Sequence, residues 1–123
     1  MKIILDSSGW IEFFVGGPLA QRYAPYLAPP SQLLTPTIVL YEVYKKLKRE
    51  RGEETALLAT GRLSAAKVIP LTEPVALLAA DISLRYGLAM ADAVVYATSR
   101  DQDAQLVTSD TDLKDLPGVV YLK

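Results

Sequence analysis

The sequence contains no histidine and no cysteine. The absence of cysteine excludes a disulfide framework, and the absence of both residues removes imidazole and thiolate groups from any catalytic mechanism. Carboxylates and hydroxyls are then the obvious oxygen donors for a functional site. Hard cations such as Mg²⁺ prefer oxygen ligands, so a metal site in this protein is expected to be built from acidic side chains.

An excess of positive charge is also missing, because 13 Lys and Arg face 14 Asp and Glu and the formal net charge is −1. This balance excludes a protein that binds polyanions over a generally basic surface, so any contact with nucleic acid must be local. The sequence further lacks an apolar run of membrane length and the charged start and apolar core of a signal peptide. We therefore expect a cytoplasmic protein without membrane association.

Short apolar runs alternate with helical patterns along the 123 residues, half of which are hydrophobic. The expected strands cover residues 2–5, 33–34, 68–71, 105–108 and 119–122, and the expected helices cover 10–14, 19–27 with a break at Pro25, 37–52, 53–66, 73–86 and 91–99. Hydroxyls of Ser7 and Ser8 are expected to cap the first helix, and a threonine of the Thr35–Thr37 segment the third. Strands separated by helices imply one α/β domain over residues 1–123, with a mostly parallel sheet covered by helices on both faces.

Four acidic residues, far apart in the sequence, stand where the expected elements would direct them to one point. Asp6 follows the apolar run Ile3–Leu5, and Asp110 follows a second such run, so both are expected at the carboxyl ends of buried strands. Glu42 and Asp92 lie in the first turns of two expected helices. Open parallel sheets bind their ligands at the carboxyl edge, so the four acids indicate a carboxylate metal site on that rim.

Each of these acids also has an ordinary structural explanation. Asp6 can form a turn, Glu42 can pair with Lys46 on a helix surface, and Asp92 can interact with a helix dipole. Asp110 can cap the turn that follows it. The joint arrangement of all four at one rim is what favours a metal site over these separate explanations.

Carboxylates crowded at one point repel one another, so an ionised cluster is stable only with a bound cation or with some protons retained. A divalent ion would polarise a phosphoryl oxygen and lower the pKa of its water from 15.7 toward about 7. Hydrolysis of a phosphodiester by water attack is the reaction that matches this chemistry. Asp112, two residues after Asp110, is expected as a secondary metal ligand.

The only basic cluster is the run Lys45–Arg51, whose simplest explanation is a solvated helix face. Lys45 and Arg49 nevertheless lie three and seven residues after Glu42, and therefore on nearly the same side of the helix. In that position they could hold phosphates that lead into the metal site. Tyr41 could stack on a base beside them.

The segments Ile3–Ser8, Ala91–Ala93 and Leu106–Leu113, together with Glu42 early in a helix, resemble the PIN domain family in their order and spacing. The resemblance covers essentially the whole chain, and a domain of this size is similar to the VapC toxins of toxin–antitoxin modules. It implies a five-stranded parallel sheet in a three-layer α/β/α arrangement and an Mg²⁺- or Mn²⁺-dependent endoribonuclease. It also implies homodimerisation and inhibition by a small partner antitoxin.

The resemblance assigns roles to individual residues of this sequence. The catalytic and metal-ligand roles fall on Asp6, Glu42, Asp92 and Asp110, and Asp112 matches a position that is acidic in many members. Ser7 takes the hydroxyl position beside the first aspartate, and Thr108 the hydroxyl before the last acidic pair. Ser7 and Thr108, with Lys45 and Arg49, form the expected RNA-binding set.

Other functions fit the sequence less well. A phosphoryl-transfer enzyme with an aspartate nucleophile would usually carry a second aspartate two residues after the first, where this chain has Ser8. A receiver domain needs a phospho-accepting aspartate near mid-chain, and residues 55–72 contain none. A non-catalytic metal- or peptide-binding regulatory module of the same fold stays open as the alternative.

Overall fold

Five short strands form one sheet in the computed structural model, which describes residues 1–123. The strands are β1 (Ile3–Leu5), β2 (Leu33–Pro36), β3 (Lys67–Ile69), β4 (Gln105–Thr108) and β5 (Val119–Tyr121). Their order across the sheet is β3-β2-β1-β4-β5, and every neighbouring pair is parallel. The expected parallel, five-stranded sheet is therefore confirmed.

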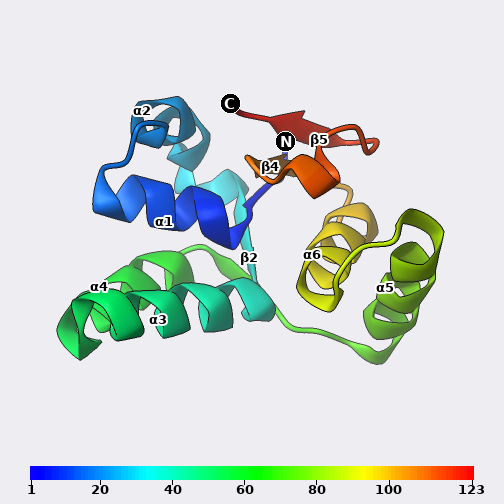
Figure 1. Ribbon diagram of the computed structural model, residues 1–123, viewed down its shortest axis with the longest axis horizontal. Helices are drawn as coiled ribbons and strands as arrows, with labels where there is room; N and C mark the ends of the chain where they lie inside the picture. The colour runs from blue at the N-terminus through cyan, green and yellow to red at the C-terminus, as the bar shows by residue number, and fades with distance from the viewer.

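Six α-helices connect the strands, joined by three short 3₁₀ helices. They are α1 (Ser7–Val15), α2 (Ala20–Tyr23), α3 (Thr37–Arg51), α4 (Glu53–Ser64), α5 (Glu73–Tyr86) and α6 (Met90–Asp101), with η1 (Ala24–Leu27), η2 (Pro30–Gln32) and η3 (Thr111–Leu113). Figure 1 shows α1 to α4 on one side of the sheet and α5 and α6 on the other. This arrangement follows from right-handed crossovers, because the chain steps outward from β1 to β3 and then returns to β4. The three-layer α/β/α prediction is confirmed.

The sheet centre lies in a core of 30 buried hydrophobic residues. The three residues of β1 are almost completely buried, as expected for a strand covered on both faces. Helix α6 is buried over the run Ala93–Ser99, where small side chains allow a helix to lie close to the strands beneath it. Helix α6 therefore holds its first turn at a fixed place beside the carboxyl edge of the sheet.

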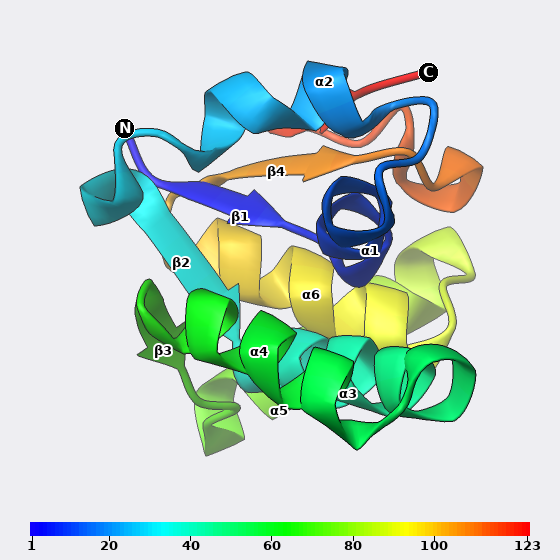
Figure 2. The ribbon, with the colours of Figure 1, turned by 90° about the vertical axis from the view of Figure 1, so that its left-hand side faces the viewer.

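The order of the strands creates a crevice between β1 and β4. The chain leaves β1 toward β2 on one side, whereas β4 pairs with β1 on the other side. In Figure 2 the arrowheads of β1 and β4 point the same way, so both strands end at one edge of the sheet. Such a switch point, outside the carboxyl ends of the strands, is the usual ligand site of an open parallel sheet.

Two predicted helix caps are wrong. Helix α1 is capped by Asp6, whose carboxylate accepts the Gly9 backbone N–H, and Ser7 and Ser8 belong to the helix itself. Helix α3 has no side-chain cap, because its N-cap residue is Pro36. The hydroxyl of Thr35 instead donates to the carbonyl of Leu63 at 3.1 Å, which ties β2 to the end of α4.

Other helix ends agree with the sequence. Helix α2 stops at Tyr23, and Pro25 lies in the 3₁₀ turn that follows. Thr72 caps α5, and Gly87 ends it in the left-handed conformation that a glycine adopts without strain. No single helix is both long and apolar enough to cross a bilayer, and α5 and α6 meet that test only as a pair bent by 117°.

Candidate functional site

Asp6 lies at the floor of the crevice, directly after β1, with only 7% of its surface exposed. Its carboxylate accepts hydrogen bonds from the hydroxyls of Thr108 (2.5 Å) and Ser8 (2.8 Å) and from the Gly9 N–H (3.1 Å). Burial raises the pKa of Asp6, the three hydrogen bonds lower it in part, and the charge of Asp110 raises it further. A buried carboxylate held by three donors has a fixed orientation toward the sheet edge.

Thr108 joins the two central strand ends. Its hydroxyl donates to Asp6 and accepts the backbone N–H of Asp110 at 2.9 Å. One threonine side chain, completely buried at the end of β4, therefore orients both acids. The expectation that Thr108 contacts RNA does not fit this burial, and the structure gives its hydroxyl a positioning role instead.

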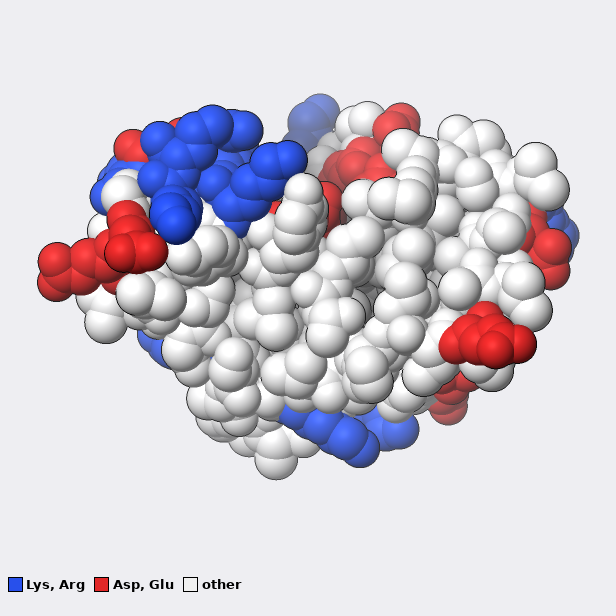
Figure 3. Space-filling model, turned by 90° about the horizontal axis from the view of Figure 1, so that it is seen from below, with Lys and Arg blue, Asp and Glu red and all other residues white.

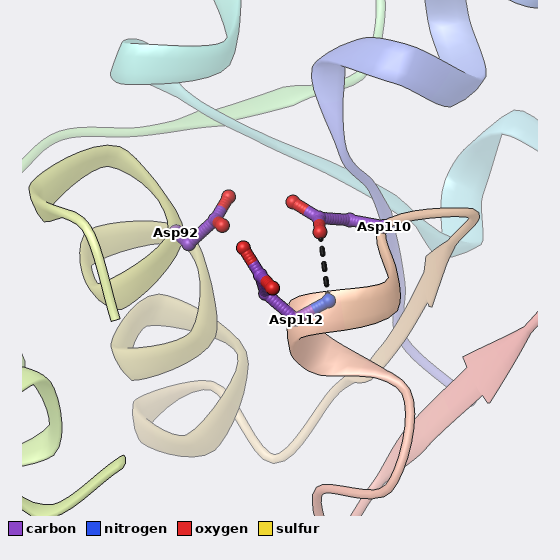
Figure 4. Close-up of side chains that lie close together, drawn as sticks. All are labelled: Asp92, Asp110 and Asp112. Atoms are coloured by element: carbon purple, nitrogen blue, oxygen red, sulfur yellow. Dashed lines mark hydrogen bonds between the residues drawn. The ribbon is translucent and has the colours of Figure 1, made fainter. Parts of the chain in front are cut away.

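Three carboxylates meet above Asp6. One oxygen from each of Asp92, Asp110 and Asp112 lies within 4.8 Å of one from each of the others. Figure 4 shows Asp92 pointing from α6 toward the two acids of the β4–η3 segment. Asp110 also caps η3 by accepting the Asp112 N–H at 2.9 Å, so its turn-capping explanation and its place in the cluster hold together.

The charge of this cluster is not balanced by basic side chains. The two salt bridges of the protein, Lys48–Glu53 and Arg49–Glu50, do not involve it. Burial raises the pKa of Asp92 to about 7, with further contributions from its hydrogen bond to the Asp110 carboxyl and from the charges of Asp110, Asp6 and Asp112. Crowded oxygen donors without a cationic partner are the set that a hard divalent cation fits.

Glu42 lies in the second turn of α3. It is half-buried, and burial raises the pKa of its carboxyl. A hydrogen bond with the Ser7 hydroxyl lowers that pKa and the charge of Asp6 raises it, so Glu42 faces the start of α1 and Asp6. Glu42 forms no salt bridge with Lys46, which removes its solvent-exposed ion-pair explanation.

The structure thus brings all the predicted acids to one edge of the sheet, but the three that lie closest together include Asp112 in place of Asp6 or Glu42. Asp112, expected as a secondary ligand, stands in the tight group with Asp92 and Asp110. Asp6 is buried more deeply than these three acids; the charge of Asp110 adds to the raised pKa of Asp6, and the charge of Asp6 adds to the raised pKa of Glu42. Sequence spacing indicated the shared edge, whereas the distances depend on the turn at η3 and on side-chain directions.

A cavity of about 290 Å³ opens beside Glu42, between α1 and α3. It is lined by Ser7, Ser8, Ile11, Tyr41, Glu42, Lys45, Lys46 and Arg49. The predicted sharing of one helix side by Glu42, Lys45 and Arg49 is seen in this lining. Figure 3 shows basic side chains gathered over α3 next to a recess that contains acidic ones.

Tyr23 is the positioning residue that the sequence did not indicate. It is completely buried in α2, and its hydroxyl is hydrogen-bonded to the hydroxyl of Ser109, which separates Thr108 from Asp110. No motif or spacing in the sequence relates α2 to this loop, because the contact spans 86 residues.

Several solved structures with a similar fold are described as toxins or as toxin–antitoxin complexes. A chain of a toxin–antitoxin complex from Klebsiella pneumoniae superposes with a TM-score of 0.81 at 26% identity, covering 97% of this chain and 96% of that one. VapC20 of Mycobacterium tuberculosis, a toxin that cleaves the sarcin–ricin loop, has a TM-score of 0.75 at 23% identity, covering 92% of both chains. VapBC2 of Rickettsia felis, bound to a promoter DNA fragment, has a TM-score of 0.78 at 15% identity, covering 99% and 98%.

Sequence comparison gives the family. No curated protein sequence matches the chain. The family model of the PIN domain matches residues 3–119, which include strands β1 to β4, the first residue of β5 and every acid of the site. The chain therefore belongs to the PIN domain family.

Proposed function

We propose that this protein is an Mg²⁺- or Mn²⁺-dependent endoribonuclease that hydrolyses RNA phosphodiester bonds by water attack. The observation that carries the proposal is the group of uncompensated carboxylates at the switch point of a PIN-domain sheet, next to a cavity lined by cations. Carboxylates alone repel a phosphodiester. Carboxylates with a bound cation attract it, and the nearby lysines add to that attraction.

Asp92, Asp110 and Asp112, with Asp6 beneath them, are the residues that would hold the cation. A bound divalent ion of this kind polarises a phosphoryl oxygen and lowers the pKa of water, which supplies a nucleophile near neutral pH without histidine. The residues of the chain do the positioning. Thr108 and Ser8 fix Asp6, and Glu42, which lines the same cavity as Ser7, presents a half-buried carboxylate that can ligate the ion or accept a proton from water.

Lys45 and Arg49, with Ser7 at the boundary of the acidic site, are the proposed RNA contacts. Both basic residues are exposed and line the same cavity as Glu42. A phosphate bound there would lie on the approach to the carboxylates. The proposed substrate is RNA in the cytoplasm, and the toxin that cleaves the sarcin–ricin loop is a structural relative with an RNA target.

A toxin role with a small antitoxin as partner is the proposed biological context. The similar structures include a toxin–antitoxin complex and two VapBC complexes bound to DNA. Expression of the protein in a bacterial host should arrest growth, and expression of the Asp92→Asn variant should not. Growth arrest by both proteins would show that the effect does not come from this site.

Homodimerisation is proposed through the apolar surface of α5 and α6. A cavity of about 300 Å³ there has seven hydrophobic residues among its eight lining residues, and one of them, Met90, is 76% exposed. Exposed apolar patches of this kind mark protein interaction sites. Ala80→Arg, at an exposed position of this lining, should convert a dimer to a monomer in light scattering, whereas Leu57→Arg on α4 should not.

A nuclease assay on the purified protein tests the enzymatic proposal. RNA should be cut with Mg²⁺ or Mn²⁺, left intact with a chelator, and left intact by Asp92→Asn. Asp81→Asn on α5 is the matched control, because Asp81 is exposed and lies outside the acidic group. Metal binding without cleavage would favour the non-catalytic regulatory module instead.

A further inference from the structure

A second polar cavity, of about 330 Å³, lies between α5 and α6, which pack side by side (Figure 1). Two arginines and two tyrosines line it together with Pro117 from the segment before β5. It shares no lining residue with either of the cavities described above. Arg100 lies in the last turn of α6 and Asp92 in the first, roughly 12 Å apart along the helix axis. The cavity is therefore separate from the carboxylate cluster.

Arg100 is one of the two arginines, and it is held from three sides. Its guanidinium donates to the Ala104 carbonyl at 3.0 Å, lies 5.6 Å from the centroid of the Tyr96 ring and rests against Gly118, where an added Cβ would collide with it. The Nε of Arg100 is nevertheless buried without a hydrogen-bond partner. Because the residue also forms no salt bridge, its charge is not compensated within the protein. A fixed guanidinium without a counter-ion is suited to bind an oxyanion.

Arg85 brings a second guanidinium to the same cavity. It lies 5.3 Å from the centroid of the Tyr86 ring, and Tyr86 packs edge-on against Tyr96 with 6.3 Å between the ring centroids. Burial raises the pKa of the Tyr96 hydroxyl, whereas the charges of Arg100 and Arg85 lower it, so both guanidiniums lie near that hydroxyl. Asp81 is the single acid of the lining and forms no salt bridge with either arginine. Two cations and one anion leave the cavity with a net positive charge.

The charges and the apolar part of the lining together indicate a class of ligand. Two guanidiniums match a phosphate monoester, which carries almost two negative charges at neutral pH and three acceptor oxygens. A phosphodiester in RNA carries only one charge per phosphate. Leu78 and Pro117 add apolar surface, and Tyr86, which is 38% exposed, offers an aromatic ring on which a planar base can stack. A phosphate monoester joined to a base therefore uses both parts of the lining.

We propose that this cavity is a binding site for a nucleoside monophosphate, with the phosphate on Arg85 and Arg100 and the base against Tyr86. The site needs neither a metal ion nor the carboxylate cluster and so goes beyond the proposed nuclease function. The Tyr96 hydroxyl donates to the Pro117 carbonyl at 2.7 Å. This hydrogen bond ties α6 to the segment before β5 and holds two sides of the cavity at a fixed separation.

Calorimetry on the full chain tests the site, with the protein freed of metal and kept in a phosphate-free buffer of low salt at pH 8. Adenosine 5′-monophosphate (AMP) should bind with a stoichiometry of one per chain. Inorganic phosphate lacks the base, adenosine lacks the phosphate, and the dinucleotide ApA has a diester in place of the monoester. Each of these three should bind at least about tenfold more weakly than AMP, since each lacks one of the recognised groups.

Arginine variants identify the residues that hold the phosphate. Arg85→Gln and Arg100→Gln should each weaken AMP binding at least about tenfold, because each removes a charge-assisted hydrogen bond. Arg62→Gln is the matched control. Arg62 also lies over an aromatic ring, at 5.2 Å from the centroid of Phe13, but outside this cavity. Its substitution should leave the affinity for AMP unchanged.

Two exposed positions of the lining separate ligand recognition from damage to the fold. Leu78→Lys should tighten AMP binding several-fold and Leu78→Glu should weaken it, because the two variants change the charge of the cavity in opposite directions. A loss of folding would weaken binding in both. Tyr86→Ala should weaken AMP binding about tenfold, the size of one base–aromatic stack, and leave the affinity for inorganic phosphate unchanged.

The outcomes distinguish this site from the nuclease. AMP binding with these dependences in the Asp92→Asn protein would support the site even if no RNA is cut by any variant. Equal affinity for AMP and ApA would assign the arginines to an RNA backbone and overturn the proposal, and equal affinity for AMP and inorganic phosphate would overturn the nucleotide class. Equal effects of Arg85→Gln and Arg62→Gln, or shifts of the same sign in the two Leu78 variants, would also refute it.

Discussion

The hydroxyl of Tyr23 is hydrogen-bonded to the hydroxyl of Ser109, which connects a short helix near the start of the chain to the loop that carries Asp110. The ring of Tyr23 is completely buried and packs against Gly9 in the first turn of α1. One tyrosine therefore contacts both segments that present acids to the crevice, since α1 begins beside Asp6. Tyr23 acts on the site through its neighbours and touches no proposed ligand directly.

Tyr23→Phe should weaken metal binding while the fold is retained. Loss of the hydroxyl leaves Ser109 without its partner, and one hydrogen bond of this kind contributes roughly 1 kcal/mol to stability. The loop that holds Asp110 then gains freedom, so Mn²⁺ affinity measured by calorimetry should fall several-fold. Tyr121→Phe on β5 is the control, and equal affinity in the two variants would contradict the positioning role of Tyr23.

Gly9→Ala should destabilise the protein by about 1–3 kcal/mol, because overpacking a well-filled core has a cost of that size. A Cβ at Gly9 would come within 2.6 Å of the Tyr23 ring, which is rigid and fully enclosed. Gly61→Ala is the matched control in the exposed face of α4, where an added Cβ meets nothing within 4 Å. That substitution should stabilise the helix by roughly 0.5–1 kcal/mol. Urea unfolding of both variants measures the change in the free energy of unfolding, which should be negative for Gly9→Ala and positive for Gly61→Ala.

The stability of the metal-free protein should decrease as the pH rises from about 4 to 7. The pKa of Asp92 is raised from 3.8 to about 7 in the folded state, so the folded protein binds more protons than the unfolded chain within this window. The free energy of unfolding then falls with increasing pH. Asp6, whose pKa is also raised, contributes with the same sign.

Urea unfolding in the presence of a chelator, at pH 5 and pH 8, measures this effect. Asp92→Asn should reduce the difference between the two pH values, whereas Asp81→Asn should leave it unchanged. Saturating Mg²⁺ should raise stability most at pH 8, where the carboxylates are ionised and repel one another in the absence of a cation. A stability that rises steadily from pH 4 to 7 in the chelated protein would refute the assignment.

Asp6→Asn should abolish cleavage but preserve the fold. Asparagine caps a helix about as well as aspartate, so α1 keeps its N-cap while the carboxylate charge is lost. Activity should fall more than about 100-fold, since changes to residues that merely orient a metal ligand already cost 10–100-fold. Asp6→Ala should add a stability loss of roughly 1 kcal/mol from the missing cap. RNA cleavage and thermal unfolding of the two variants separate these effects.

Part of the site could be predicted from the sequence because the carboxyl ends of all strands in a parallel sheet lie at the same edge. The apolar run before Asp6 and the one before Asp110 located both acids at a common edge, and the structure brings them together there. The identity of the caps could not be predicted in the same way. Ser7, Ser8 and Asp6 are all good capping residues in sequence, and only the path of the chain after β1 gives the role to Asp6.

Contacts between distant segments were the other missing information. Thr108 was expected to contact RNA. In the structure its side chain is completely buried, and its hydroxyl is hydrogen-bonded to Asp6 and to the Asp110 N–H. Tyr23 gave no signal, because a tyrosine in an amphipathic segment is ordinarily a core residue. The basic face of α3 was indicated by helical spacing, but its division into paired Lys48 and unpaired Lys45 and Lys46 depends on where α4 begins.

The hydrogen bond from Thr108 to Asp6 spans 102 residues, so the two halves of the crevice come from opposite ends of the sequence. A ribosome must therefore synthesise more than a hundred residues, and β4 must insert beside β1, before the carboxylates can meet. Nascent and truncated chains that stop before this strand have no assembled site. An activity directed against cellular RNA would in this way be withheld from the polypeptide while its own messenger is still being translated.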